Sequence, residues 1–204
     1  RQWMKGATSV QDKNVVLLGD SLTAGWNNTP GYPNGAQILK DYAAKYPQVR
    51  PISFGMSGDG PENTLWLVTA GKLPALFPSP KVIVLMIGIN SLNKFSSKNQ
   101  TEFDPENVAE DIATIVNCFQ RERPAAKLLL LGILPCWGPT APVRQAISHT
   151  NERIRSLADD KNIFFLDFGH QMLLPDGKIH PELTYDDLHL TSQGYALWAS
   201  MMFP

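Results

Sequence analysis

Residues 15–22 read Val-Val-Leu-Leu-Gly-Asp-Ser-Leu, and this stretch decides the fold. Four consecutive apolar residues at positions 15–18 are typical of a short strand that is buried on both faces of a sheet. The polar residues that follow predict a turn at the carboxyl end of the strand. In an open parallel sheet this is the edge where ligands bind, so Ser21 is a candidate for chemistry.

Further apolar runs of strand length recur along the chain and are separated by segments with a helical period. The runs are short and rich in Val, Ile, Leu and Phe, which favours buried strands over helices. The expected strands are residues 15–18, 49–54, 82–87, 128–133 and 163–166.

The clearest helix is expected to begin after Asp104, which is a good N-cap and is followed by Pro105 at the first helical position. One apolar stripe at helical spacing follows it, so this helix should pack on the sheet. The stripe consists of Val108, Ile112, Ile115, Val116 and Phe119. Weaker helical patterns cover residues 35–45, 61–72, 143–158 and 191–201.

Strands that alternate with helices indicate parallel βαβ units with right-handed crossovers. We therefore expect an α/β fold, a three-layer αβα sandwich of the flavodoxin-like type. Its five-stranded parallel sheet should have the strand order 2-1-3-4-5. A chain of 204 residues without a linker or repeat should form a single domain over residues 1–204.

Composition narrows the function classes. The net charge is −1 and Lys and Arg are scattered, so no nucleic-acid partner is expected. No apolar run is long enough to cross a bilayer. Cys118 and Cys136 lack metal-ligand spacing, and no disulfide is expected. The chain begins at Arg1 without a signal peptide, which indicates processing or trimming, so secreted, periplasmic and cytoplasmic locations all stay open.

Two residues near the other end of the chain, Asp186 and His189, stand three positions apart. A serine hydroxyl needs a histidine to accept its proton and a carboxylate to orient that histidine. Together with Ser21 these residues predict a serine hydrolase that requires no metal and no organic cofactor.

Four ordered motifs support this interpretation and carry a resemblance to a known family. The motifs are Gly19-Asp20-Ser21-Leu22, the glycine of Ser57-Gly58-Asp59, Gly88-x-Asn90 and Asp186-x-x-His189. In these motifs, and over almost its whole length, the sequence resembles the SGNH, or GDSL-type, hydrolases. In the stretches Phe54-Gly-Met-Ser-Gly-Asp59, Pro80-Lys-Val-Ile-Val-Leu85 and Leu131-Gly-Ile-Leu-Pro135 it is similar to the catalytic subunits of platelet-activating-factor acetylhydrolase and their bacterial relatives.

The resemblance implies a role for each motif residue. It makes Ser21 the nucleophile, His189 the general base and Asp186 its orienting carboxylate. The oxyanion hole would consist of the Ser21 N–H, the Gly58 N–H and the Asn90 side-chain amide. Such donors suit a developing oxyanion because they are fixed before the reaction. The resemblance further implies a small acyl pocket and a glycan or small-molecule acetyl ester as substrate.

Three other residues are candidates for substrate binding: Asp20, Trp26 and Trp137. For the two tryptophans, packing in the core is an equally good explanation, and Asp20 could instead be a helix N-cap. Other functions also stay open. These are a lipid-directed esterase, a non-catalytic glycan-binding protein, and a flavin-binding protein that uses residues 21–25 as a phosphate loop. The last would leave Asp186 and His189 without a role.

Overall fold

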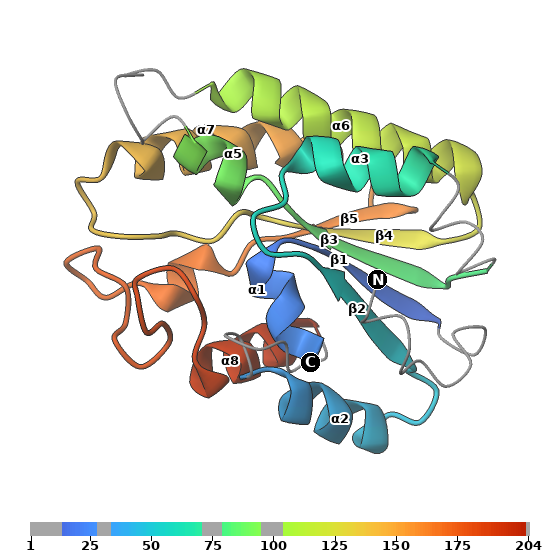
Figure 1. The fold of residues 1–204 in the computed structure, drawn as a ribbon, viewed down its shortest axis with the longest axis horizontal. Helices are drawn as coiled ribbons and strands as arrows, with labels where there is room; N and C mark the ends of the chain where they lie inside the picture. The colour runs from blue at the N-terminus through green and yellow to red at the C-terminus, as the bar shows by residue number, and fades with distance from the viewer. Residues whose placement is uncertain (1–13, 28–33, 71–78, 95–103, 203–204) are drawn as a thin grey trace.

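The computed structural model describes residues 14–27, 34–70, 79–94 and 104–202. Within them, five parallel strands form one sheet in the order β2-β1-β3-β4-β5, which confirms the expected topology (Figure 1). The strands are β1 (Val15–Gly19), β2 (Pro51–Gly55), β3 (Val82–Met86), β4 (Lys127–Leu131) and β5 (Ile163–Leu166).

Helices cover both faces of the sheet, so the predicted three-layer sandwich is confirmed (Figure 1). One face carries α3 (Pro61–Thr69), α5 (Ile89–Lys94), α6 (Pro105–Glu122) and α7 (Pro142–Arg155). The other face carries α1 (Ser21–Ala24), α2 (Ala36–Lys45) and α8 (Ser192–Met202).

Strand β1 is buried along its whole length because it lies between β2 and β3 and contributes side chains to both layers. Val16 and Leu18 belong to the core beneath α6, whereas Val15 and Leu17 belong to the core beneath α2 and α8. Alternate residues of a strand point to opposite faces, so a strand with apolar layers on both sides needs a continuous apolar run.

Helix α6 forms as its sequence predicts. Asp104 is the N-cap and its carboxylate accepts the backbone N–H of Asn107 at 2.9 Å. Pro105 is the first helical residue, and every residue of the predicted stripe is buried. Burial of this stripe against β3 and β4 anchors the helix, since a cap alone contributes only about 1 kcal/mol.

The sequence pattern does not predict the short helices of this fold. Helix α1 has four residues and α5 has six, which is too short to produce a hydrophobic period. Two 3₁₀ turns, Gly25–Asn27 and Gly169–Met172, were missed for the same reason. Helix α3 ends at Thr69 rather than at residue 72, and residues 71–72 lie outside the described residues.

Two further properties can be stated for the described part of the chain. None of its helices has both the length and the apolar character that crossing a membrane would require. Cys118 and Cys136 are both buried and are not bonded to each other.

Just beyond β4, which pairs with β5 as far as Leu131, a side chain holds the backbone at Ile133. Asn151 on α7 accepts the backbone N–H of Ile133 at 2.8 Å and donates to the Ile133 carbonyl at 2.9 Å. This side chain is buried, so both backbone groups depend on it. Asn151 thereby fixes the start of the loop that follows β4.

Replacing Asn151 with Ala should lower the free energy of unfolding by about 2–4 kcal/mol, because it leaves two buried backbone groups unpaired. Chemical denaturation monitored by circular dichroism would measure this change. Asn117 lies on the exposed side of α6, and Asn117→Ala is the matched control, with an expected change within about 0.5 kcal/mol. Equal effects of the two substitutions would contradict the assigned role of Asn151.

Candidate active site

The carboxyl end of β1 delivers Ser21 to the edge of the sheet. Ser21 is the first residue of α1, and its neighbour Asp20 is the N-cap, whose carboxylate accepts the Leu22 N–H at 2.9 Å. The next strand is tied to the same point, because the Met56 N–H donates to the Gly19 carbonyl at 3.0 Å. The start of α1 is therefore fixed by both strand pairing and its own cap.

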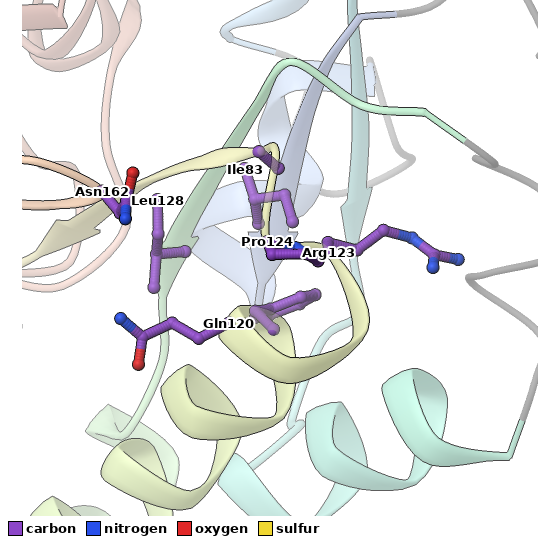
Figure 2. Close-up of a pocket in the computed structure, with 8 residues that line it drawn as sticks. Ile83, Gln120, Arg123, Pro124, Leu128 and Asn162 are labelled. Atoms are coloured by element: carbon purple, nitrogen blue, oxygen red, sulfur yellow. The ribbon is translucent and has the colours of Figure 1, made fainter.

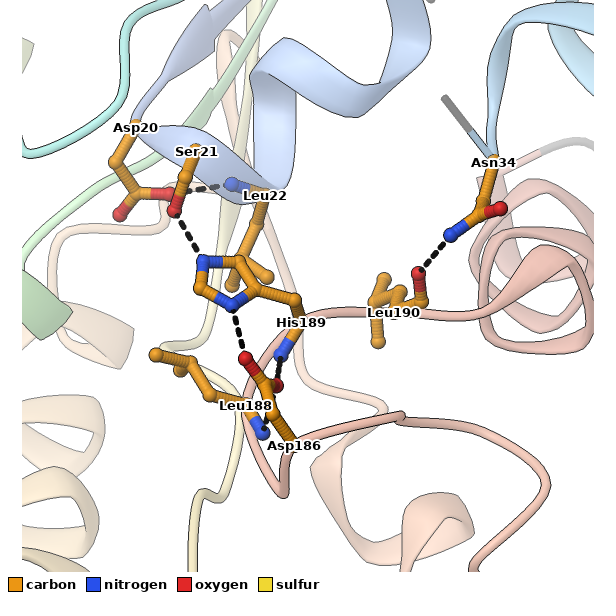
Figure 3. A network of polar contacts seen from close by, with 8 residues as sticks. All are labelled: Asp20, Ser21, Leu22, Asn34, Asp186, Leu188, His189 and Leu190. Carbon is orange, nitrogen blue, oxygen red and sulfur yellow. Dashed lines mark hydrogen bonds and ion pairs between the residues drawn. The ribbon is translucent and has the colours of Figure 1, made fainter. Parts of the chain in front are cut away.

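Three side chains that are distant in sequence form one hydrogen-bonded chain at this edge (Figure 3). The Ser21 Oγ lies 3.0 Å from His189 Nε2, and His189 Nδ1 lies 2.6 Å from Asp186 Oδ2. The structure thus brings together the three residues that the sequence suggested as nucleophile, base and orienting acid. Asp186 is the acidic residue in contact with the ring, although Asp187 stands beside it.

The spacing of three residues between Asp186 and His189 has a local cause. The second carboxylate oxygen, Oδ1, accepts the backbone N–H of Leu188 at 3.1 Å and that of His189 at 2.6 Å. This closed turn leaves Oδ2 directed at the imidazole. Burial acts to raise the pKa of Asp186, but the hydrogen bonds from His189 and Leu188 and the His189 charge prevail and lower it.

The loop that carries His189 is held on two sides. Thr184 and Leu190 form an isolated antiparallel bridge across its base. The Asn34 side chain, at the start of the α2 segment, donates to the Leu190 carbonyl at 3.1 Å (Figure 3). Tyr185 stacks on the His189 ring with centroids 5.8 Å apart, and 52% of Tyr185 is exposed.

Tyr185 was not among the residues selected from the sequence. Its only signal there was its position directly before Asp186.

The two remaining motif residues follow β2 and β3, which flank β1. Gly58 has a φ of +84°, a conformation that favours glycine, and open space surrounds the position where a Cβ would stand. The Asn90 Nδ2 donates to the Asp59 carbonyl at 2.9 Å and so links the loop after β2 to α5. Among the described residues, neither the Ser21 N–H nor the Gly58 N–H donates a hydrogen bond.

Asp20 does not serve as an open binding group, because only 1% of it is exposed. The structure supports the alternative interpretation of Asp20 as the cap of α1. Burial raises its pKa to about 7, the Leu22 N–H opposes this effect, and the nearby Asp59 charge adds to it.

The structure corrects the suggestion that Trp26 lines a cleft. Trp26 is 2% exposed and packs edge-to-face on Tyr195 and Trp198, with centroids 4.7 and 5.1 Å away. Its large apolar surface fills the layer between α1 and α8, which explains why it is inaccessible. Trp137 is half-buried, and its backbone N–H donates to the Asp187 carbonyl at 2.9 Å, beside the loop that carries His189.

A surface hollow exists elsewhere on the molecule and is separate from this site (Figure 2). Ile83 and Leu128 line it from the starts of β3 and β4, and Arg123 and Pro124 line it from the connection between α6 and β4. It therefore lies at the amino edge of the sheet, opposite Ser21. Within the described ranges, no three or more His, Cys, Asp or Glu residues are grouped so that they could hold a metal ion.

Comparison with known proteins identifies relatives over most of the chain. The model of the GDSL-like Lipase/Acylhydrolase family matches residues 17–197. Platelet-activating factor acetylhydrolase IB subunit alpha2 from Homo sapiens is 29% identical over 190 residues, which cover 91% of this chain and 72% of the relative. Subunit alpha1 from Homo sapiens is 28% identical over 186 residues, with 91% and 71% covered.

Solved structures with this fold include esterases and a lipase. An acetyl xylan esterase from Geobacillus stearothermophilus is 18% identical, with a TM-score of 0.72, and the match covers 94% of this chain and 93% of the other. A GDSL-like lipase from Bacteroides thetaiotaomicron is 22% identical, also with a TM-score of 0.72, and covers 94% and 86%. These likenesses concern the fold.

The raised pKa of Asp20 predicts a dependence of stability on pH. The folded protein binds this proton more tightly than the unfolded chain, whose carboxyl has a pKa of 3.8. Stability from Asp20 is therefore complete below about pH 4 and is lost as the pH rises through about 7, by up to roughly 4 kcal/mol. Asp20→Asn keeps a cap but cannot titrate. The variant should gain stability relative to the wild type between pH 5 and 8.

Urea denaturation of both proteins at pH 5, 6, 7 and 8 measures this difference. Asp41→Asn, on the exposed face of α2, controls for the change in net charge. A stability difference between wild type and Asp20→Asn that stays constant over this range would show that Asp20 titrates as an ordinary carboxyl.

Proposed function

Because the chain belongs to the GDSL-like lipase/acylhydrolase family and is a carboxylic ester hydrolase, we propose that Ser21, His189 and Asp186 are its catalytic triad. The observation that carries the proposal is the unbroken chain of hydrogen bonds from Ser21 Oγ through both ring nitrogens of His189 to Asp186 (Figure 3). This is the arrangement that proton transfer from a serine hydroxyl requires.

In the first step His189 Nε2 accepts the Ser21 proton while Oγ attacks the ester carbonyl carbon. The carbonyl π electrons move to oxygen, and a tetrahedral oxyanion forms. Asp186, a carboxylate with a lowered pKa, stabilises the imidazolium that results. His189 then gives the proton to the departing alkoxide, so the alcohol leaves and an acyl-serine remains.

Water completes the cycle by the same route. His189 removes a proton from the water as it attacks the acyl carbon, and the proton returns to Ser21 Oγ when the second tetrahedral species collapses. The carboxylic acid is released and the enzyme is restored. The groups that act are the same in both halves, in reverse roles.

The oxyanion would be held by the Ser21 N–H, the Gly58 N–H and the Asn90 amide. Neither backbone N–H donates a hydrogen bond to another of the described residues, which supports this assignment. Asn90 uses its Nδ2 to reach the Asp59 carbonyl, but that nitrogen carries a second hydrogen. This bond also orients the loop that carries Gly58, since Asp59 is its neighbour.

We propose an acetyl group as the acyl half of the ester. The relatives support this choice, because platelet-activating factor acetylhydrolase and acetyl xylan esterase both carry it in their names. The loops at residues 57–60 and 135–138 would form the walls of the acyl pocket. Trp137 in the second loop is tied to Asp187, so this wall stands beside the catalytic turn.

For the alcohol half we propose a carbohydrate. The exposed ring of Tyr185 beside His189 supports this choice, because an aromatic face next to the reacting centre is a surface on which a sugar ring can stack. A lipid alcohol is the second candidate. The curated relatives named for platelet-activating factor favour it, and the exposed side chain of Met56 after β2 could contact an alkyl chain.

Ser21→Ala should lower kcat for p-nitrophenyl acetate by on the order of 10⁴ or more while circular dichroism and the melting temperature stay close to the wild type. Ser148→Ala, on the exposed face of α7, is the control and should keep full activity. A fluorophosphonate probe should label Ser21 in the wild type. Labelling at Ser57 or Ser91 would contradict the assignment of the nucleophile.

Activity should fall with acyl length. Each methylene that the pocket cannot house costs about 1–3 kcal/mol, so p-nitrophenyl butyrate should be hydrolysed at least about tenfold less efficiently than acetate, and the octanoate should be nearly inert. The measurement is kcat/KM across the series, with Ser21→Ala as the blank. Efficiency that rises from acetate to octanoate would reject the small pocket and leave the triad intact.

An assay of acetate release can identify the alcohol half of the ester. Release of acetate from acetylated xylo-oligosaccharides should exceed release from a dispersed 2-acetyl phospholipid. The reverse order would replace the carbohydrate by a lipid alcohol.

A further inference from the structure

Arg144 lies where the local structure of its helix gives no reason for a cation. It is the third residue of α7, in the first turn, where the partial positive charge of the helix end disfavours a positive side chain. It is half-buried, and desolvation lowers its pKa, an effect that the proximity of Cys136 and Asp187 opposes. Tertiary contacts must therefore account for this residue.

These contacts are three backbone carbonyls from two separate segments. Arg144 Nε donates to the Cys136 carbonyl at 2.8 Å, and Nη2 donates to the Trp137 carbonyl at 3.1 Å. Nη2 also donates to the Gly177 carbonyl at 2.9 Å. The planar guanidinium can reach several acceptors in fixed directions, which a lysine ammonium cannot reproduce.

The guanidinium thus clamps the loop after β4 to the turn around Gly177, which precedes the catalytic loop. The two segments also pack directly, because a Cβ at Gly177 would stand 3.0 Å from the Cβ of Pro139. Gly177 closes a turn with Leu174, within the hairpin that Leu173 and Ile179 bridge.

One more hydrogen bond links Trp137, which Arg144 contacts, to the turn that carries Asp186 and His189. The Trp137 N–H donates to the Asp187 carbonyl at 2.9 Å, and Asp187 lies between Asp186 and Leu188. Trp137 and Asp187 both adopt positive φ, +54° and +60°, which is costly for residues other than glycine and persists only where the surroundings hold it.

We propose that Arg144 is a positioning residue for the triad. It fixes the carbonyls of Cys136 and Trp137, so that the Trp137 N–H holds the Asp187 peptide and, with it, the turn that aims Asp186 at His189. The inference rests on the proposed function, because it assigns Arg144 a role in the same Ser21–His189–Asp186 mechanism. Arg144 itself does not touch the reacting atoms.

Arg144→Gln should lower kcat for p-nitrophenyl acetate on the order of 10- to 100-fold, since small misplacements of a catalytic group have effects of this size. KM should change by a smaller factor than kcat, because the loop at residues 135–138 forms only part of the proposed acyl pocket, whereas a displaced Asp186 slows both chemical steps. The acidic limb of the kcat–pH profile should move to lower pH, because a displaced Asp186 stabilises the imidazolium of His189 less. The low-field proton NMR signal of the His189 Nδ1–H should weaken in parallel.

Two further variants sharpen the test. Arg153→Gln removes an exposed arginine of the same helix, which pairs with Glu106, and should leave kcat, the pH profile and the NMR signal unchanged. Arg144→Lys keeps the charge but cannot reach three carbonyls, so it should show a partial loss of kcat with the same shift of the pH profile. It also carries the test if Arg144→Gln does not fold.

The folded Arg144 variants could melt at a lower temperature and still keep the wild-type kcat, pH profile and NMR signal. That result would overturn the inference, because Arg144 would then be only structural. The proposed function fails separately. The proposed function would be wrong if ester hydrolysis by the protein did not depend on Ser21, whatever the Arg144 variants do.

Discussion

The close approach of β1 to β3 at Gly19 is the constraint on which the site depends. Gly19 ends β1 opposite Gly55 on one side and Met86 on the other. A Cβ at Gly19 would stand 2.2 Å from the Met86 carbonyl oxygen, so no larger residue fits without moving β3. Because the three strands are parallel and their carboxyl ends are paired in register, the loops after β1, β2 and β3 leave the sheet together, and Ser21, Gly58 and Asn90 share one edge.

Two carboxyls near Ser21 and His189 show how the environment of an acid sets its pKa. Asp186 accepts hydrogen bonds from His189 and Leu188, and its pKa is lowered. Asp20 is enclosed and accepts one backbone N–H, and burial raises its pKa to about 7. An acid that must stabilise an imidazolium has to be ionised, whereas a helix cap can work in either state. The difference in burial fits the proposed role of Asp186 and the capping role of Asp20.

The sheet provides the fold, whereas the loops provide the geometry of the candidate site. Proteins with this fold include an acetyl xylan esterase and a GDSL-like lipase at 18–22% identity, so the fold itself does not select the substrate. The segment between β5 and α8 carries Tyr185, Asp186 and His189, and it is almost free of regular structure. Its geometry depends on side-chain and backbone hydrogen bonds, including the contact of Trp137 with Asp187. Its residues Phe168, Met172, Ile179 and Leu190 belong to the core beneath α2 and α8, whereas exposed positions such as Tyr185 can be substituted without disturbing that core.

Local patterns in the sequence determined the elements and the identity of the candidate site. The apolar run at residues 15–18 correctly predicted a strand, and the cap and apolar stripe of α6 correctly predicted a helix. Both signals are local, because the spacing of buried side chains and the capping of a helix involve residues only a few positions apart. Tertiary structure alone decided that Trp26 is core, that Asp20 is buried and that Arg144 clamps two loops. The Ser21–His189 contact joins residues 168 positions apart. No local pattern can fix such a distance, since it results from the packing of every element between them.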